Sequence, residues 1–239
     1  MASVAGMRTE EIGPRLHRIL FGFGQAYLWR DDDSLTLIDT GCAGDGAEVA
    51  AALRSLGLRP DDLDRVVLTH FHEDHAGGAA EIGAWPGVTV LAHRADAPVI
   101  RGEVPGQPPN FTDWERELYA RVAPDLPPAP PARVDVELTD GDVLDFGGGA
   151  RIVGTPGHTD GSIAIHLPAH RVLITGDIAA HVDGEVMFGV FHVDWDRAMA
   201  SFRRLADLDV DTVCFGHGDP VTRDGGARLR AAAHQTASG

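Results

Sequence analysis

The chain has 239 residues, 44% of them hydrophobic and 23% charged, a composition typical of globular proteins. Its formal net charge of −16 argues against a nucleic-acid partner, because phosphate binding draws on clustered basic side chains that this chain scatters. No run approaches the roughly 20 apolar residues of a membrane span, and no signal-peptide pattern opens the sequence, so we expect a cytoplasmic protein without a membrane partner.

The first part of the chain alternates predicted strands and helices. Short β-prone runs separated by Gly and Asp turns predict an antiparallel meander over residues 15–41. Apolar residues at helical spacing predict a helix within 44–60, followed by a strand at 64–70. A short helix within 76–87 and a strand at 88–93 continue a layered α/β pattern.

A proline-rich segment at about 98–131 breaks this alternation and contains a predicted helix at 110–122. Structureless connections in compact domains are usually much shorter, so we interpret the segment as an insertion in a single domain spanning residues 1–239. It is a candidate lid whose Trp114 and Tyr119 would close over an apolar part of a small-molecule substrate. The alternatives are a cap on a sheet edge or a contact in a homodimer.

The remainder repeats the first part in outline. Strands are predicted at 133–138, 150–155, 162–167, 171–176 and 211–216, and a helix is predicted at 196–208.

The stretch "HFHEDH" holds four candidate metal ligands, His70, His72, Asp74 and His75. His70 and His72 are two apart and can point the same way from an extended segment, while the acid and the third histidine follow on the next turn. Imidazole nitrogen and carboxylate oxygen suit zinc, iron or manganese. Since the cluster contains no thiolate, an open catalytic site is favoured over a closed structural one.

Three further ligand types stand in glycine-rich turns at the ends of predicted strands. They are His158 in "GTPGHTDGS", Asp177 in "LITGD" and His217 in "CFGHGDP". Neighbouring glycines allow the backbone to pack close to an ion.

These motifs, in this order and preceded by "LIDTG" at 37–41, resemble those of the metallo-β-lactamase superfamily. The resemblance runs from about residue 37 to 220 and implies a four-layer αββα sandwich with a dinuclear metal site at one edge. It implies that Asp39 orients a ligand histidine, as carboxylates often do around metals. The implied ligands are His70, His72 and His158 for one ion, Asp74, His75 and His217 for the other, with Asp177 bridging.

Such a site implies a hydrolase that uses a metal-bridging hydroxide, with two zinc ions expected and manganese or iron as alternatives. Asp74 would act in catalysis by steadying the leaving group and the transferred proton. The expected substrate is an ester, thioester or lactone of a small molecule, in a branch similar to glyoxalase II. However, the Gly-Arg segment that follows the aspartate in glyoxalase II is missing, and Ala179 and Ala180 stand near where quorum-signal lactonases have a tyrosine.

Three alternatives stay open. A persulfide dioxygenase would use one iron held by His70, His158 and Asp177, and a β-lactamase-like enzyme would cleave an amide, although true β-lactamases usually lack an acid at the position of Asp177. A binding protein with a relic site is disfavoured because all seven ligand types are present. Four residues after the bridging aspartate are candidates either for the pocket wall or for the core: Phe188, Phe191, His192 and Trp195.

Overall fold

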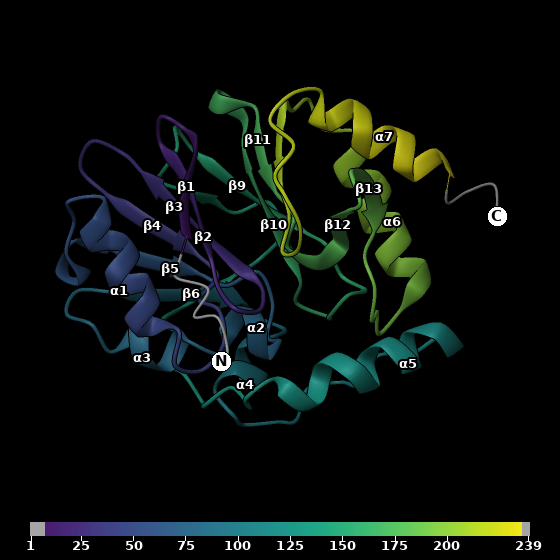
Figure 1. Ribbon diagram of the computed structural model, residues 1–239, viewed down its shortest axis with the longest axis horizontal. Coiled ribbons are helices and arrows are strands. Elements are labelled where there is room, and N and C mark those ends of the chain that lie inside the picture. The colour runs from purple at the N-terminus through teal and green to yellow at the C-terminus, as the bar shows by residue number, and fades with distance from the viewer. Residues whose placement is uncertain (1–7, 236–239) are drawn as a thin grey trace, which may run out of the picture.

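The computed structural model describes residues 8–235 and has four layers, with two β-sheets packed face to face and helices on both outer faces (Figure 1). This is the αββα sandwich that the motifs predict. Among the described helices, none is long and apolar enough to cross a membrane.

The first sheet has seven strands in the order of the sequence. They are β1 (Arg8–Gly13), β2 (Leu16–Leu20), β3 (Gln25–Arg30), β4 (Leu35–Ile38), β5 (Arg65–Val67), β6 (Thr89–His93) and β7 (Val136–Leu138). Strands β1 to β4 pair antiparallel, which confirms the predicted meander, and β4 to β7 pair parallel. The parallel strands β4 and β5 therefore end at the same edge of the sheet.

The second sheet has five strands in the order β14-β11-β10-β9-β8. They are β8 (Val143–Leu144), β9 (Ala150–Gly154), β10 (Ile163–Leu167), β11 (Val172–Ile174) and β14 (Thr212–Cys214). A separate hairpin pairs β12 (Ala179–Val182) with β13 (Glu185–Phe188). Because β11 and β14 are parallel, their carboxyl ends also meet at one edge.

Seven α-helices are described: α1 (Gly46–Ser55), α2 (Glu73–Ala76), α3 (Ala79–Gly83), α4 (Ala97–Ile100), α5 (Asp113–Val122), α6 (Trp195–Ala206) and α7 (Gly225–Gln235). Helices α1 and α3 cover the first sheet, and α6 and α7 cover the second (Figure 1). The 3-10 turns are η1 (Pro60–Asp62), η2 (Ala123–Asp125), η3 (Pro168–His170) and η4 (Gly176–Ile178).

Three buried apolar clusters hold these layers together. Val49 and Ile82 pack the first helix layer onto the first sheet, and Phe202 and Leu229 pack the second layer onto the second sheet. Between the sheets, side chains such as Ile165 meet those of the opposite sheet in a third cluster. Full burial of each such side chain contributes about 1.5–3 kcal/mol to folding, so the sandwich forms a firm support for loops at its edge.

Most predicted helices and strands are present, but the β12–β13 hairpin and α7 were not predicted. The hairpin had a signal, because Asp183 and Gly184 form a two-residue loop in which both φ angles are positive, 52° and 84°. Asp-Gly is a preferred pair for such a turn. Helix α7 begins with two glycines and is rich in alanine, so its apolar spacing is a weak signal.

The helix predicted at 110–122 is confirmed as α5. It begins with a capping box in which the Glu115 side chain accepts hydrogen bonds from the backbone N–H and the hydroxyl of Thr112, both at 2.8 Å. The segment runs across the end of the sandwich near α2 and α4 (Figure 1).

Candidate metal centre

All seven predicted ligand residues converge at one edge of the sandwich. His70 follows β5, and His72, Asp74 and His75 stand at the start of α2 or within it. The second sheet contributes the other three, from the β9–β10 loop (His158), from η4 after β11 (Asp177) and from the loop after β14 (His217). Two groups form, and the potential ligand atoms within each lie within 4.8 Å of one another.

The first group consists of three histidines, His70, His72 and His158. The Nε2 atom of His158 lies 3.2 Å from Nε2 of His70 and 3.1 Å from Nδ1 of His72. Burial, together with the neighbouring histidines, lowers the pKa of each of these rings, so all three favour the neutral form that binds metals. Three neutral ring nitrogens facing a common point suit one divalent ion.

The second group contains Asp74, His75, Asp177 and His217. His217 Nε2 lies 3.0 Å from Asp74 Oδ2 and 3.3 Å from Asp177 Oδ2, and His75 Nε2 lies 3.2 Å from Asp177 Oδ1. Burial alone would lower the pKa of His75, but the carboxylates of Asp177 and Asp74 raise it well above its ordinary value. The carboxylates therefore attract positive charge, which a metal cation supplies.

Two further observations fit a cation here. Although His75 Nε2 and Asp177 Oδ1 lie 3.2 Å apart, both are buried and neither makes a hydrogen bond of normal geometry within the described residues, which is rare for buried polar atoms. Gly216 leaves the space beside them open, since a Cβ atom there would lie 1.8 Å from Asp177 Oδ1 and 2.7 Å from His75 Cε1. The glycine next to His217 thus permits the close packing that the sequence predicts for these turns.

Asp39 supports histidines of both groups. Its Oδ2 atom accepts hydrogen bonds from Nδ1 of His75 and from the hydroxyl of Thr69, each at 2.8 Å. The Thr69 hydroxyl in turn lies 3.0 Å from Nδ1 of His70. Both histidines are thereby held with Nε2 directed into the site, so Asp39 has the orienting contact that the resemblance implies.

A buried polar network on β2 and β3 holds the loop of His217. Arg18, which is 3% exposed, donates to the carbonyl oxygen of Gly218 and to Asp219, and Gln25 donates to the carbonyl oxygens of Phe215 and Gly218. Sequence reasoning missed these residues, because they are about 200 positions from the loop that they contact.

Asp96, which is buried, joins the two loops that carry the first group. Its carboxylate accepts hydrogen bonds from the backbone N–H of Phe71 at 3.1 Å, from the hydroxyl of Thr159 at 2.7 Å and from the backbone N–H of Gly161 at 2.7 Å. Burial raises the pKa of this carboxyl to about 6. Asp96 follows β6 at the same edge as Asp39, a position that could have drawn attention to it.

The four residues after Asp177 that were candidates for the pocket wall or the core have different positions. Phe191 lines the cavity over the metal centre, whereas Phe188, His192 and Trp195 do not. His192 is fully buried, bonds through Nε2 with the carbonyl oxygen of Gly189 at 2.9 Å, and packs edge-on against His158 with ring centroids 5.5 Å apart. His192 therefore packs behind a candidate ligand.

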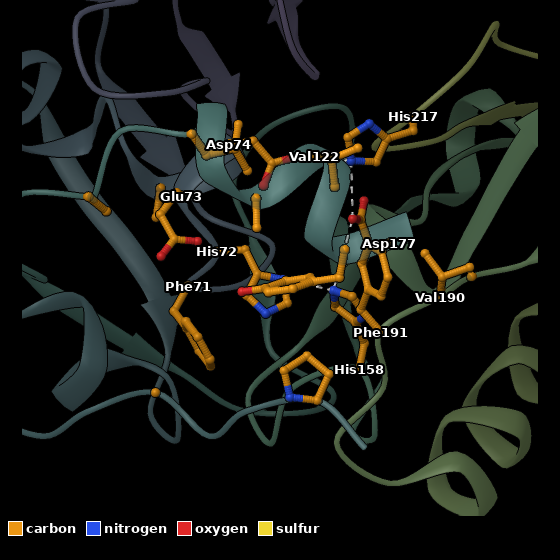
Figure 2. A pocket seen from close by; sticks show the side chains of 18 of the residues that line it. Phe71, His72, Glu73, Asp74, Val122, His158, Asp177, Val190, Phe191 and His217 are labelled. Carbon is orange, nitrogen blue, oxygen red and sulfur yellow. Dashed lines mark hydrogen bonds and ion pairs between the residues drawn. The ribbon is translucent and has the colours of Figure 1, made fainter. Parts of the chain in front are cut away.

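A cavity of about 860 Å³ opens over both groups, with His72, Asp74, His158, Asp177 and His217 in its wall. Figure 2 shows Asp177 beside His158 and His217, with Asp74 toward the His217 end. The cavity falls in the size range of small-molecule sites.

A family model for the metallo-β-lactamase superfamily matches residues 19–217. The chain therefore belongs to this superfamily, which confirms the resemblance, and it is a metal-dependent hydrolase. It is 29% identical over 210 residues to a probable metallo-hydrolase, YflN, of Bacillus subtilis, covering 79% of this chain and 77% of the relative.

The chain is also 31% identical over 176 residues to a hydroxyacylglutathione hydrolase of Cereibacter sphaeroides, covering 72% of this chain and 55% of the relative. It thus spans about half the length of that relative. Among solved structures, a Cronobacter sakazakii metallo-β-lactamase with a HARLDQ motif matches with a TM-score of 0.74 and 22% identity, covering 95% of this chain and 92% of that one. The similarity to this structure concerns the fold alone.

Proposed function

We propose that the two ligand groups hold two divalent metal ions and that the protein hydrolyses an ester, thioester or lactone bond of a small molecule. The observation that carries the proposal is the position of Asp177 between the groups. Its Oδ2 atom lies 3.9 Å from Nε2 of His158 and 3.3 Å from Nε2 of His217. A single carboxylate in reach of both groups is what a shared, dinuclear site requires.

Zinc is the ion we propose, because histidines supply five of the seven candidate ligands and imidazole suits zinc, although the same set also suits iron or manganese. Bound divalent ions would supply Lewis acidity and would lower the pKa of a water molecule toward about 7. In the overall reaction, water adds its oxygen to the acyl carbon, the acyl C–O or C–S bond breaks, and a proton passes to the leaving group.

The residues of the chain have distinct roles in this proposal. Asp74 lines the cavity, and its Oδ2 atom lies 3.0 Å from Nε2 of His217. Although burial opposes ionisation, the adjacent His75 and His217 hold the pKa of Asp74 well below its usual range. Asp74 therefore stays a carboxylate, and its low pKa makes it a transient carrier of the proton that passes from water to the leaving group, not a group that retains it.

Named relatives support a thioester or a related acyl substrate, since several are hydroxyacylglutathione hydrolases. The sequence identity is only about a third and covers only part of those proteins. It therefore supports the type of bond that is cleaved, but not the glutathione part of their substrate.

The competing function is a one-iron dioxygenase that uses His70, His158 and Asp177. It would leave Asp74, His75 and His217 converging on no ion, with His75 Nε2 buried and without a hydrogen bond of normal geometry within the described residues. The second group therefore favours the dinuclear hydrolase. Amide cleavage of the β-lactamase type is supported by fold similarity alone.

A substrate panel tests the proposal. The purified chain would be assayed with thioesters, lactones, carboxylic esters, phosphodiesters and β-lactams before chelation, after chelation and after addition of zinc or manganese. We expect hydrolysis of at least one acyl substrate that chelation abolishes and metal restores. Acyl hydrolysis that survives complete metal removal, or oxygen consumption with a persulfide in place of hydrolysis, would contradict the proposal.

A further inference from the structure

The cavity over the metal centre has two chemically different ends. One end holds the metal-binding groups, and the rest is lined mainly by apolar side chains from α5, the proline-rich piece after it, the β12–β13 hairpin and the loop that follows β13. In Figure 2, Phe71 lies on one side of His72 and His158, and Val190 and Phe191 lie on the other. A substrate bound at the metals would thus place its remaining atoms against apolar walls.

Apart from three histidines of the metal-binding groups, the described lining of the cavity contains no basic side chain that could pair with a substrate anion. The sequence has no lysine, and none of its arginines is among the lining residues. Beyond those histidines, the charged residues of the wall are the acids Glu73, Asp74 and Asp177. Glu73 is exposed and is not one of the proposed metal ligands. It therefore adds negative charge at the mouth of the cavity. A carboxylate remote from the metals would be repelled there.

Helix α5 is fixed over the cavity by a buried carboxylate. Glu115 is fully buried, and its Oε1 atom accepts a hydrogen bond from the backbone N–H of Phe191 at 2.8 Å. The backbone N–H of Asn110 also donates to the carbonyl oxygen of His192 at 2.8 Å. These bonds tie the segment that precedes and includes α5 to the loop after β13.

The tie brings three aromatic rings together in the cavity wall. Tyr119 lies 4.8 Å from Phe111 and 5.3 Å from Phe191, measured between ring centroids. Tyr119 and Trp114, another lining residue on α5, are 40% and 52% exposed, although both are large apolar side chains. An apolar ligand in the cavity would cover such surface.

We infer that the substrate is an uncharged ester, thioester or lactone that carries a long alkyl or an aryl group. The polar acyl carbon would lie at the metal-binding groups, and the apolar group would lie between α5 and the loop of Phe191. This inference rests on the proposed function. It assigns a substrate class to the cavity and disfavours substrates with remote carboxylates, such as glutathione thioesters and β-lactam acids.

Arg116 is the residue that could oppose this inference. Its guanidinium carbon lies 5.6 Å from the centre of the Phe111 ring, although Arg116 is not among the lining residues. If Arg116 turned inward to bind an anionic group, its replacement would selectively weaken the binding of an anionic substrate. Arg116→Ala is therefore a control, and we expect it to leave the preference among substrates unchanged.

Kinetics with matched substrates provide the first test. The metal-loaded chain would be assayed with methyl esters, which carry no aryl group, whose straight acyl chains run from acetyl to decanoyl, and with esters of the same lengths that end in a carboxylate. We expect kcat/KM to rise along the neutral series by up to about fourfold per methylene buried. The carboxylate-terminated esters should be hydrolysed at least about tenfold less efficiently than their neutral counterparts. A flat series, or a preference for the anionic esters, would overturn the inference.

Binding provides a test that does not depend on turnover. Titration calorimetry of the metal-loaded chain with decanamide and propanamide, both neutral, should give much tighter binding of decanamide. Phe191→Ala and Tyr119→Ala should each weaken the binding of decanamide by about tenfold. Val143→Ala, which replaces an exposed apolar residue on β8, should not. Equal binding of the two amides would also overturn the inference.

The two proposals fail in different ways. Metal-dependent hydrolysis restricted to short or anionic acyl substrates would refute the apolar substrate and leave the hydrolase intact. If no acyl substrate is hydrolysed in a metal-dependent way, the proposed function fails, and the decanamide titration still decides whether the cavity binds an apolar chain.

Discussion

Asp39 accepts a hydrogen bond from Nδ1 of His75 at 2.8 Å, although the two residues lie 36 positions apart in the sequence. Asp39 follows β4 and has a φ angle of 62°, a left-handed conformation that residues other than glycine adopt rarely. The same carboxylate reaches His70 through the hydroxyl of Thr69. One acid thus orients a histidine of each ligand group.

Replacement of Asp39 by Asn should weaken metal binding at both groups. An amide can offer its nitrogen where His75 now finds a carboxylate oxygen, so we expect a loss of about 10–100-fold in metal affinity or activity with the fold retained. The measurement is a zinc titration of the chelated protein. Asp64→Asn is a matched control, because Asp64 accepts a backbone bond from Leu35 outside the site and should have no effect on the titration. If the zinc titration of Asp39→Asn were unchanged, Asp39 would only stabilise the turn in which it lies.

Replacement of Gly216 by Ala should remove metal from the second group. The added Cβ atom would meet Asp177 Oδ1 at 1.8 Å, so the carboxylate would have to leave its position beside His75. We expect elemental analysis to find substantially less metal per chain, while circular dichroism stays close to that of the unchanged protein. Gly22→Ala is the control, since no described atom lies within 4 Å of the Cβ position there. Full metal content in Gly216→Ala would contradict the assigned position of Asp177.

Asp96 should make stability depend on pH between about 4 and 6. Its pKa in the folded protein is about 6, against 3.8 for an ordinary aspartate, because burial disfavours the charged form. The folded chain therefore keeps a proton that the unfolded chain has released. The stability contributed by this proton is fully present below pH 3.8 and is lost as the pH rises through about 6.

The measurement compares urea unfolding of the unchanged protein and of Asp96→Asn, in the same metal-loaded state, at several pH values from 4 to 7. Relative to Asp96→Asn, the free energy of unfolding of the unchanged protein should fall by about 2.5 kcal/mol over this range. Titrations shared by both proteins cancel in the difference. A difference that does not change with pH would mean that the carboxyl titrates normally.

The segment at about 98–131 should control substrate binding but not metal content. Glu115→Ala removes the acceptor for the N–H of Phe191 and loosens α5, so we expect a higher KM for the apolar substrate and unchanged metal. Glu117→Ala, on the exposed side of the same helix, is the control. Shortening the whole segment to a Gly-Ser turn should have the same effect, more strongly. A shift in oligomeric state by sedimentation, with unchanged kinetics per site, would instead identify the segment as a dimer contact.

The convergence of the seven candidate ligands could be predicted from the sequence because ligand chemistry lies in short motifs. His70, His72 and His75 come from one stretch, and a glycine flanks each of the more distant ligands on at least one side. The order of strands and helices was equally readable where apolar residues form a short continuous run or recur at helical spacing, as in β10 and α6 respectively.

The supporting residues could not be predicted in the same way. Arg18 and Gln25 read as ordinary residues of a meander, and their function follows only when the loop of His217 is placed beside them. Glu115 reads as the acid of a capping box, which it is, but its second hydrogen bond to Phe191 spans 76 residues. Such contacts depend on tertiary packing that local spacing does not encode.

The most direct test of the dinuclear site is the metal content of the purified 239-residue chain, measured by elemental analysis beside that of Asp177→Ala. The account predicts close to two zinc or manganese ions per unchanged chain. It predicts lower occupancy of both groups and loss of turnover in the variant, with the fold retained because the apolar clusters lie elsewhere. One iron per chain in the unchanged protein, or two tightly bound ions and full activity in Asp177→Ala, would contradict it.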